Sequence, residues 1–141
     1  MIVALLAGCA TTAPPPPSLQ TVVDRHIAAI QSRNFVDIVA TSTQGRDLLL
    51  IFPTGRITRT RAEYLEFHET FFAAPDWVMT FEPVHLHETG GYGHALYRTS
   101  FDEDGAGPVP ARPGYLTLGF GLENGEWRLV HDQNTAIAAE R

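Results

Sequence analysis

The sequence contains no lysine, only one cysteine, and no apolar run approaching the roughly 18 residues of a transmembrane helix. All ten basic residues are arginine, and 16 acidic residues bring the formal net charge to -6. Because phosphate contacts need a concentrated positive patch, this charge balance argues against a nucleic-acid partner. A single cysteine excludes an intrachain disulfide and any zinc site built from cysteines.

The composition that remains is that of one globular domain. The chain has 141 residues, of which 44% are hydrophobic and 18% charged. This balance supplies enough apolar groups for one core and is not a disordered composition. The length leaves room for a single domain.

The N-terminal residues are typical of a targeting segment rather than of a fold. The segment Leu6-Ala7-Gly8-Cys9 resembles the lipobox of bacterial lipoproteins, in which the cysteine is acylated and becomes the first mature residue. We therefore expect residues 1–9 to be a lipoprotein signal. Residues 10–17 contain four consecutive prolines, which favour an extended tether.

An acylated Cys9 would hold the protein on the periplasmic side of a bacterial membrane. We expect this membrane to be the outer membrane, since Ala10 is not the aspartate that commonly marks inner-membrane retention. The basic residues that normally precede such a segment are missing. Either the true start lies further upstream or the segment is not exported.

The single domain, residues 18–141, begins with helical patterns. Residues 19–30 carry apolar side chains at helical spacing, with Ser18 as a suitable N-cap. Residues 35–43 predict a second, shorter helix. Residues 60–63 read Thr-Arg-Ala-Glu, a capping box that predicts the start of a third helix.

The other patterns predict strands. Pro83 has no amide hydrogen to donate, so we expect a bulge or bend near it. A run of helices followed by an antiparallel meander predicts an α+β fold, with helices on one face of a curved sheet. The predicted strands cover residues 47–52, 56–59, 77–88, 92–101, 115–122 and 126–134.

Three segments carry a resemblance to a known family. They are residues 23–30, residues 35–60 and residues 125–135. The last segment reads GEWRLVHDQNT, close to the pattern G-x-W-x-hydrophobic-x-H. These segments resemble the NTF2-like superfamily, close to SnoaL-like and ketosteroid-isomerase-like domains. The resemblance implies a cone-shaped α+β barrel with a pocket between the helices and the concave sheet. Such domains include isomerases, cyclases, dehydratases and non-catalytic binding proteins, so the fold does not fix the function.

The last hairpin predicts where the polar end of that pocket lies. If Asn124-Gly125 form the turn, Leu118 faces His131, and strict alternation places His131 and Gln133 on the same side as Trp127. That side is apolar near the turn, where Trp127 lies deep in the core, and becomes polar at His131. This pattern is typical of a mostly apolar cavity with a few polar groups.

Two further histidines lie within apolar helical stripes. His26 is in the first helix and His68 in the third, and we expect both to approach the pocket. Buried imidazoles need hydrogen-bond partners, which Tyr64, Tyr97 or Gln133 could supply. A metal site is not favoured, because no carboxylate shares the stripes. The candidate ligand-binding residues are His26, Tyr64, His68, Tyr97, His131 and Gln133.

A second histidine group lies on the predicted hairpin turned by Gly90-Gly91. His87 faces His94 across this hairpin, and His85 lies two residues away on the same side. The spacing is compatible with a metal site. The opposite side of the hairpin is the better core face, however, so we expect these histidines to form a solvated or dimer-facing patch without a metal.

Comparison with ketosteroid isomerases argues against their chemistry. His26 stands where the resemblance implies the tyrosine that holds the oxyanion, and Phe52 stands where it implies the aspartate that acts as general base. A phenyl ring cannot accept a proton. The second acid of those enzymes, a protonated aspartate on a later strand, has no counterpart on the expected core face.

These observations favour a lipid-anchored domain that binds a small apolar molecule without catalysing a reaction. The alternative is an isomerase, cyclase or dehydratase that uses His26 or His131 as acid or base. A third interpretation is an assembly module whose sheet binds a partner. We expect no cofactor and no metal. We also expect a homodimer formed through the outer side of the sheet, where Tyr115, Thr117, Arg128 and Val130 lie.

Overall fold

The computed structural model describes residues 13–105 and 110–138. The predicted lipobox with Cys9 lies outside the described residues. None of the helices within the described ranges is long and apolar enough to span a membrane. In chain order the elements are α1 (Leu19–Ser32), α2 (Phe35–Thr41), β1 (Asp47–Ile51), β2 (Ile57–Thr60), α3 (Arg61–Ala73), β3 (Val78–Thr89), β4 (Tyr92–Asp102), β5 (Arg112–Glu123) and β6 (Glu126–Ala136).

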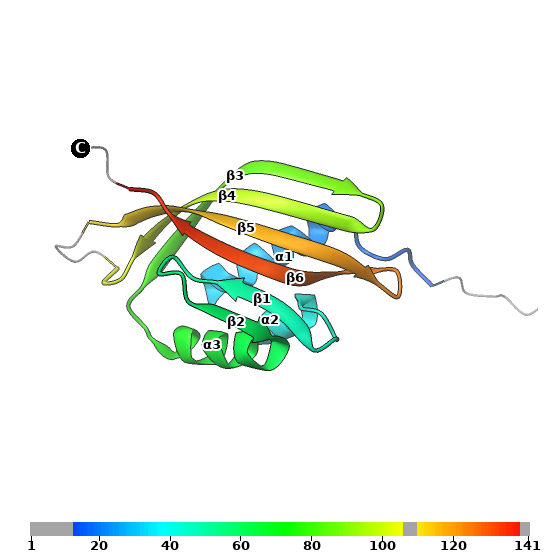
Figure 1. The fold of residues 1–141 in the computed structure, drawn as a ribbon, viewed down its shortest axis with the longest axis horizontal. Helices are drawn as coiled ribbons and strands as arrows, with labels where there is room; N and C mark the ends of the chain where they lie inside the picture. Colours follow the sequence, from blue (N-terminus) through cyan, green and yellow to red (C-terminus); the bar gives the residue numbers. More distant parts are fainter. Residues whose placement is uncertain (1–12, 106–109, 139–141) are drawn as a thin grey trace, which may run out of the picture.

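The six strands form one curved sheet in the order β2-β1-β6-β5-β4-β3. All neighbouring strands are antiparallel except β1 and β6, which are parallel. Figure 1 shows α1 and α2 on one side of this sheet and α3 beside β1 and β2. The predicted α+β architecture, with helices on a mostly antiparallel sheet, is confirmed.

Local sequence signals account for the starts of the helices. The Ser18 hydroxyl accepts a hydrogen bond from the amide of Thr21 at 3.2 Å, as expected of an N-cap. At the start of α3, the amide of Glu63 donates to the Thr60 hydroxyl at 3.2 Å, and the Glu63 carboxylate accepts from the Thr60 amide at 3.0 Å. Both predicted caps are confirmed.

The core lies between the helices and the concave face of the sheet. Val23 of α1 and Tyr64 of α3 are fully buried against strand residues such as Leu118, Phe120 and Leu129. Trp127 is only partly buried at the edge of this cluster, so the prediction that it lies deep in the core is wrong.

Two bulges set which side chains face the core. The first leaves Val84 unpaired beside Pro83, where the missing amide hydrogen predicted an irregularity. The second lies in the last hairpin. Phe120 faces Leu129 as predicted, but Gly119 then faces His131, so Val130 has no partner on β5.

The second bulge overturns the predicted register beyond Leu129. Leu118 faces Asp132 rather than His131, and Thr117 faces Gln133. Since an extra residue shifts every later side chain to the other face, Asp132 points into the concave side and His131 points out.

Candidate functional site

The structure has a pocket of about 620 Å³ among the described residues. It lies between α3, the β1–β2 turn and the concave side of β4, β5 and β6. Its wall is largely apolar, as is typical of sites for small molecules. The apolar side chains lining it include Leu50, Phe52, Phe67, Phe71, Met79, Phe101 and Leu116.

Asp132 is a buried carboxylate that lines this pocket. Only 3% of the residue is exposed. The side-chain amide of Asn134 donates to Oδ1 at 2.9 Å, and the hydroxyl of Tyr64 lies 3.4 Å from Oδ2. Desolvation by burial raises the pKa of Asp132 to about 7, although the hydrogen bonds from Tyr64 and Asn134 act in the opposite direction.

A chain of buried hydrogen bonds continues behind Asp132. The Tyr64 hydroxyl lies 3.2 Å from Nε2 of His26, and Nδ1 of His26 lies 2.7 Å from the Thr41 hydroxyl. Thr41 in turn donates to the carbonyl of Asp37 at 2.7 Å. Burial and the nearby His68 lower the pKa of the fully buried His26 to about 3, so this imidazole is neutral near pH 7.

Counting protons along this chain assigns the donors. The single hydroxyl proton of Thr41 is used on the Asp37 carbonyl, so Thr41 accepts from Nδ1–H of His26. The neutral imidazole then has a bare Nε2 that accepts a proton donor. Tyr64, with one hydroxyl proton, donates either to this nitrogen or to Asp132.

The protonation state of Asp132 decides between these two directions. When Asp132 is ionised, the Tyr64 hydroxyl donates to it, and Nε2 of His26 loses that donor. When Asp132 is protonated, its own O–H donates to the Tyr64 oxygen, which frees the tyrosine proton for His26. In the neutral state every group of the chain has a partner, whereas in the ionised state the Tyr64 hydrogen bond stabilises the carboxylate, which is the direction in which it acts on the pKa of Asp132.

His68 is the histidine that lines the pocket itself. Its Nδ1–H donates to the backbone carbonyl of Tyr64 at 2.9 Å, which fixes the ring against α3. The centroids of the His68 and Tyr64 rings are 4.2 Å apart. Burial lowers the pKa of His68 to about 4, and the hydrogen bond to Tyr64 opposes that shift.

The six predicted binding residues fall into four groups. His68 lines the pocket, while His26 and Tyr64 lie behind Asp132, in the chain that reaches it. Tyr97 is buried in the core but is not part of the pocket wall.

His131 and Gln133 form the fourth group, and their predicted place in the pocket is wrong. The bulge at Val130 turns both side chains to the outer face of the sheet. A Cβ added to Gly119 would lie 3.1 Å from Cβ of His131 and 2.6 Å from the hydroxyl of Tyr92, which locates these two residues on that outer face.

The sequence reasoning missed Asp132. The expectation that no acid on a later strand faces the core is wrong, because the same bulge turns this carboxylate inward. Phe52 does line the pocket mouth, with its ring edge-on to Phe67 at a centroid distance of 4.8 Å. The two-residue spacing of Asp132 and Asn134 predicts a shared face of the strand, but His131 and Gln133 have the same spacing, so no signal in the sequence singled out Asp132.

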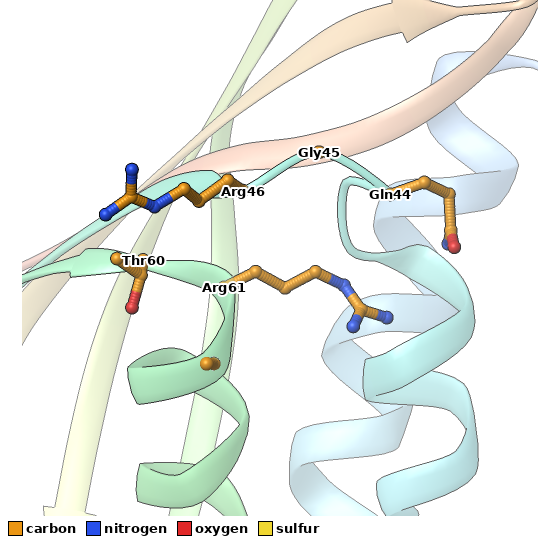
Figure 2. Close-up of a pocket in the computed structure, with 6 residues that line it drawn as sticks. Gln44, Gly45, Arg46, Thr60 and Arg61 are labelled. Atoms are coloured by element: carbon orange, nitrogen blue, oxygen red, sulfur yellow. The ribbon is translucent and has the colours of Figure 1, made fainter.

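A second hollow of about 460 Å³ lies at the surface where β2 meets α3, lined by Gln44, Gly45, Arg46, Thr60, Arg61 and Ala62. Figure 2 shows that the guanidinium groups of Arg46 and Arg61 point in opposite directions. The backbone amides of Arg59 and Thr60 at this helix start already donate to Oε2 of Glu63, at 3.1 Å and 3.0 Å. This hollow therefore offers no convergent set of groups for a ligand.

Comparison with solved structures identifies the same architecture elsewhere. A proposed calcium/calmodulin-dependent protein kinase type II association domain from Thiobacillus denitrificans has a TM-score of 0.75 at 17% identity, over 89% of this chain and 100% of that one. A proposed dehydratase of the NTF2-like family from Streptomyces avermitilis has a TM-score of 0.73 at 16% identity, over 86% of this chain and 94% of that one. A proposed ketosteroid isomerase from Shewanella frigidimarina has a TM-score of 0.68 at 17% identity, over 82% of this chain and 92% of that one.

At these identities the likeness concerns the fold alone. No curated protein matches the sequence. The SnoaL-like domain family, in contrast, matches residues 19–139, which include every helix and strand. The chain therefore belongs to the SnoaL-like domain family and has the NTF2-like fold.

Proposed function

We propose that this domain binds a small, largely apolar molecule in the pocket and catalyses a proton transfer on it, with Asp132 as the group that exchanges the proton. The observation that carries the proposal is the position of Asp132. It is a carboxylate that lines an apolar cavity while being 3% exposed, and it contacts a hydroxyl that can either donate to it or accept from it.

The pocket supports a ligand that is mostly hydrocarbon with one polar end. Its volume lies within the range of several hundred Å³ typical of small-molecule sites. Aromatic side chains from α3 form much of the wall, Asp132 and Asn134 supply buried or half-buried polar groups, and the exposed ion pair of Arg112 and Glu103 also lines the pocket. A carbonyl compound with an acidic neighbouring C–H bond is the class of substrate that fits this arrangement.

The buried chain supports both halves of a proton-transfer cycle. The ionised Asp132 takes a proton from the substrate carbon, and the Tyr64 proton turns toward Nε2 of His26 as the new O–H of Asp132 bonds to the tyrosine oxygen. Return of the proton to another atom of the substrate reverses these bonds. Since the pKa of Asp132 is raised to about 7, both states are accessible near neutral pH.

His26 and Tyr64 act in this proposal as positioning residues, because neither lines the pocket. His26 is also a poor base at pH 7, with its pKa lowered to about 3. We therefore assign the proposed acid–base role to Asp132 rather than to the histidines. Two structures of similar fold are described as a proposed isomerase and a proposed dehydratase, reactions that both move protons.

Deuterium exchange tests the proposal with simple probes. The protein is incubated in D₂O with a panel of enolisable cyclic ketones, such as cyclohexanone and 1-tetralone, and incorporation of deuterium beside the carbonyl is followed by NMR. We expect the native protein to exchange at least one of them about 10²–10⁴ times faster than Asp132→Asn, the usual contribution of a positioned acid–base group.

Binding of the probe is followed in the same samples through the aromatic resonances of Phe67 and Phe71, which line the pocket. A ketone that shifts these resonances but exchanges equally in both proteins would contradict catalysis and leave a binding protein. If no ketone of the panel shifted them, the proposed ligand class would be wrong. The lipid anchor at Cys9, the outer membrane location and the homodimer stay predictions beside this proposal.

A further inference from the structure

Three of the six histidines of the chain gather on the outer face of the β3–β4 hairpin. His85 and His87 are two residues apart on β3, and His87 is paired directly with His94 on β4. We call these three residues the outer histidine cluster. His85 and His87 are exposed and His94 is half-buried.

The hairpin holds these rings close to one another. The ring centroids are 5.3 Å apart for His85 and His94, 5.8 Å for His87 and His94, and 6.2 Å for His85 and His87. Direct pairing across β3 and β4 fixes the Cα positions through the Gly90-Gly91 turn. The backbone therefore constrains all three side chains to one small area.

These spacings can be compared with the geometry of a zinc site. With Zn–N bonds of about 2.0–2.1 Å, an imidazole centroid lies about 3.2 Å from the metal, and two such rings at the tetrahedral angle have centroids about 5.2 Å apart. The three observed separations exceed this value by about 1 Å or less. No backbone movement is needed to close a difference of this size.

We propose that His85, His87 and His94 form a surface binding site for a divalent transition-metal ion such as Zn²⁺, with water as the fourth ligand. Three neutral imidazoles are a common protein ligand set for this ion and leave one position open. This site lies on the opposite face of the sheet from Asp132 and is independent of the proposed catalysis.

The rings reach ligand geometry by side-chain rotation. Among the residues that the structure describes, no group of three or more His, Cys, Asp or Glu is already arranged to hold a metal. Exposed side chains change rotamer readily, so the rotation of His85 and His87 carries little cost. Binding should therefore order these two rings, which is a measurable consequence.

His131 supplies a matched control on the same face. His94 and His131 both pair with Gly119, from opposite sides, so their strands are separated by about 9.5 Å. The Tyr92 hydroxyl lies over Gly119, in the space between His94 and His131. Replacing His131 removes an outer histidine without touching the proposed site.

The test is a calorimetric titration of metal-free full-length protein with ZnCl₂ at pH 7.5. All samples carry Cys9→Ser, which removes the only thiol that could compete for the ion. We expect one equivalent of Zn²⁺ to bind, with affinity reduced on the order of 100-fold in His87→Ala and in His94→Ala. His131→Ala should bind as the native sequence does, and His87→Gln serves as a second variant if His87→Ala fails to fold.

NMR of the imidazole Hε1 protons locates the ion. Saturation with Zn²⁺ should shift and sharpen three of these resonances, those lost in the single variants of His85, His87 and His94. Absence of binding at about 1 mM Zn²⁺ would overturn the proposal. So would a site that His131→Ala weakens as much as His87→Ala does.

Discussion

Polar side chains have opposite environments on the two faces of the sheet. On the concave face, Asp132 is 3% exposed and bonded to Tyr64 and Asn134, and its pKa is raised to about 7. Its chain neighbour His131 lies on the outer face, on the same side as the outer histidine cluster. The difference arises from one unpaired residue, Val130, which sets the faces of both neighbours.

The buried and exposed histidines extend this comparison. Burial lowers the pKa of His26 to about 3 and that of His68 to about 4, and both rings are held by hydrogen bonds. The cluster residues His85 and His87 are exposed instead. Histidine therefore has two roles in this account. On the concave face it belongs to a buried hydrogen-bond network, and on the outer face it is a proposed metal ligand.

The largest loss of stability should come from truncating a core side chain of the last hairpin, between its turn and the bulge. Phe120 is fully buried, and Phe120→Ala should lower the free energy of unfolding by about 3–5 kcal/mol. Trp127, which is only partly buried, should cost less than about 3 kcal/mol when changed to alanine. Urea unfolding of the two variants measures the difference, and a Trp127→Ala cost equal to that of Phe120→Ala would contradict the placement of the hairpin.

The next effect, of similar total size between about pH 4 and 7, concerns how stability depends on pH. Because the folded pKa of Asp132 is above its unfolded value of 3.8, the folded state binds more protons at this residue between about pH 4 and 7. The contribution of Asp132 to stability is thus complete at low pH and is lost as the pH rises toward 7. Asp132→Asn, which cannot ionise, should therefore gain stability relative to the native protein by about 1.4 kcal/mol per pH unit in this window.

Urea unfolding at several pH values between 4 and 8 measures this slope. The lowered pKa values of His26 and His68 act in the other direction, since their unfolded forms take up protons below about pH 6.5. They are present in both proteins and cancel in the difference. Asp76→Asn, the same change at an exposed aspartate, is the matched control.

Much of the fold could be predicted because its signals are local. The cap at Ser18, the capping box at Thr60 and the irregularity at Pro83 each depend on residues close in the chain. Burial of His26 and His68 could also be predicted, because both occupy positions within apolar stripes at helical spacing.

The candidate site was harder to predict, for a physical reason found in β6. From the Asn124-Gly125 turn to Leu129, apolar residues alternate and fix the register. Beyond Val130, residues 131–135 are all polar, so either face could turn inward without an evident cost in apolar burial. Nothing in that pattern distinguishes Asp132 from His131, and the partners of Asp132 come from distant Tyr64 as well as nearby Asn134.

The most direct test is the titration of the Asp132 carboxyl group itself. Its side-chain ¹³C resonance is identified by its absence in Asp132→Asn and followed by NMR from pH 3 to 9. The buried, pocket-lining position predicts a midpoint near pH 7, and Tyr64→Phe should raise it further because the tyrosine hydrogen bond favours the ionised form. A midpoint near pH 4 would place Asp132 in water and would contradict both the register and the proposed chemistry.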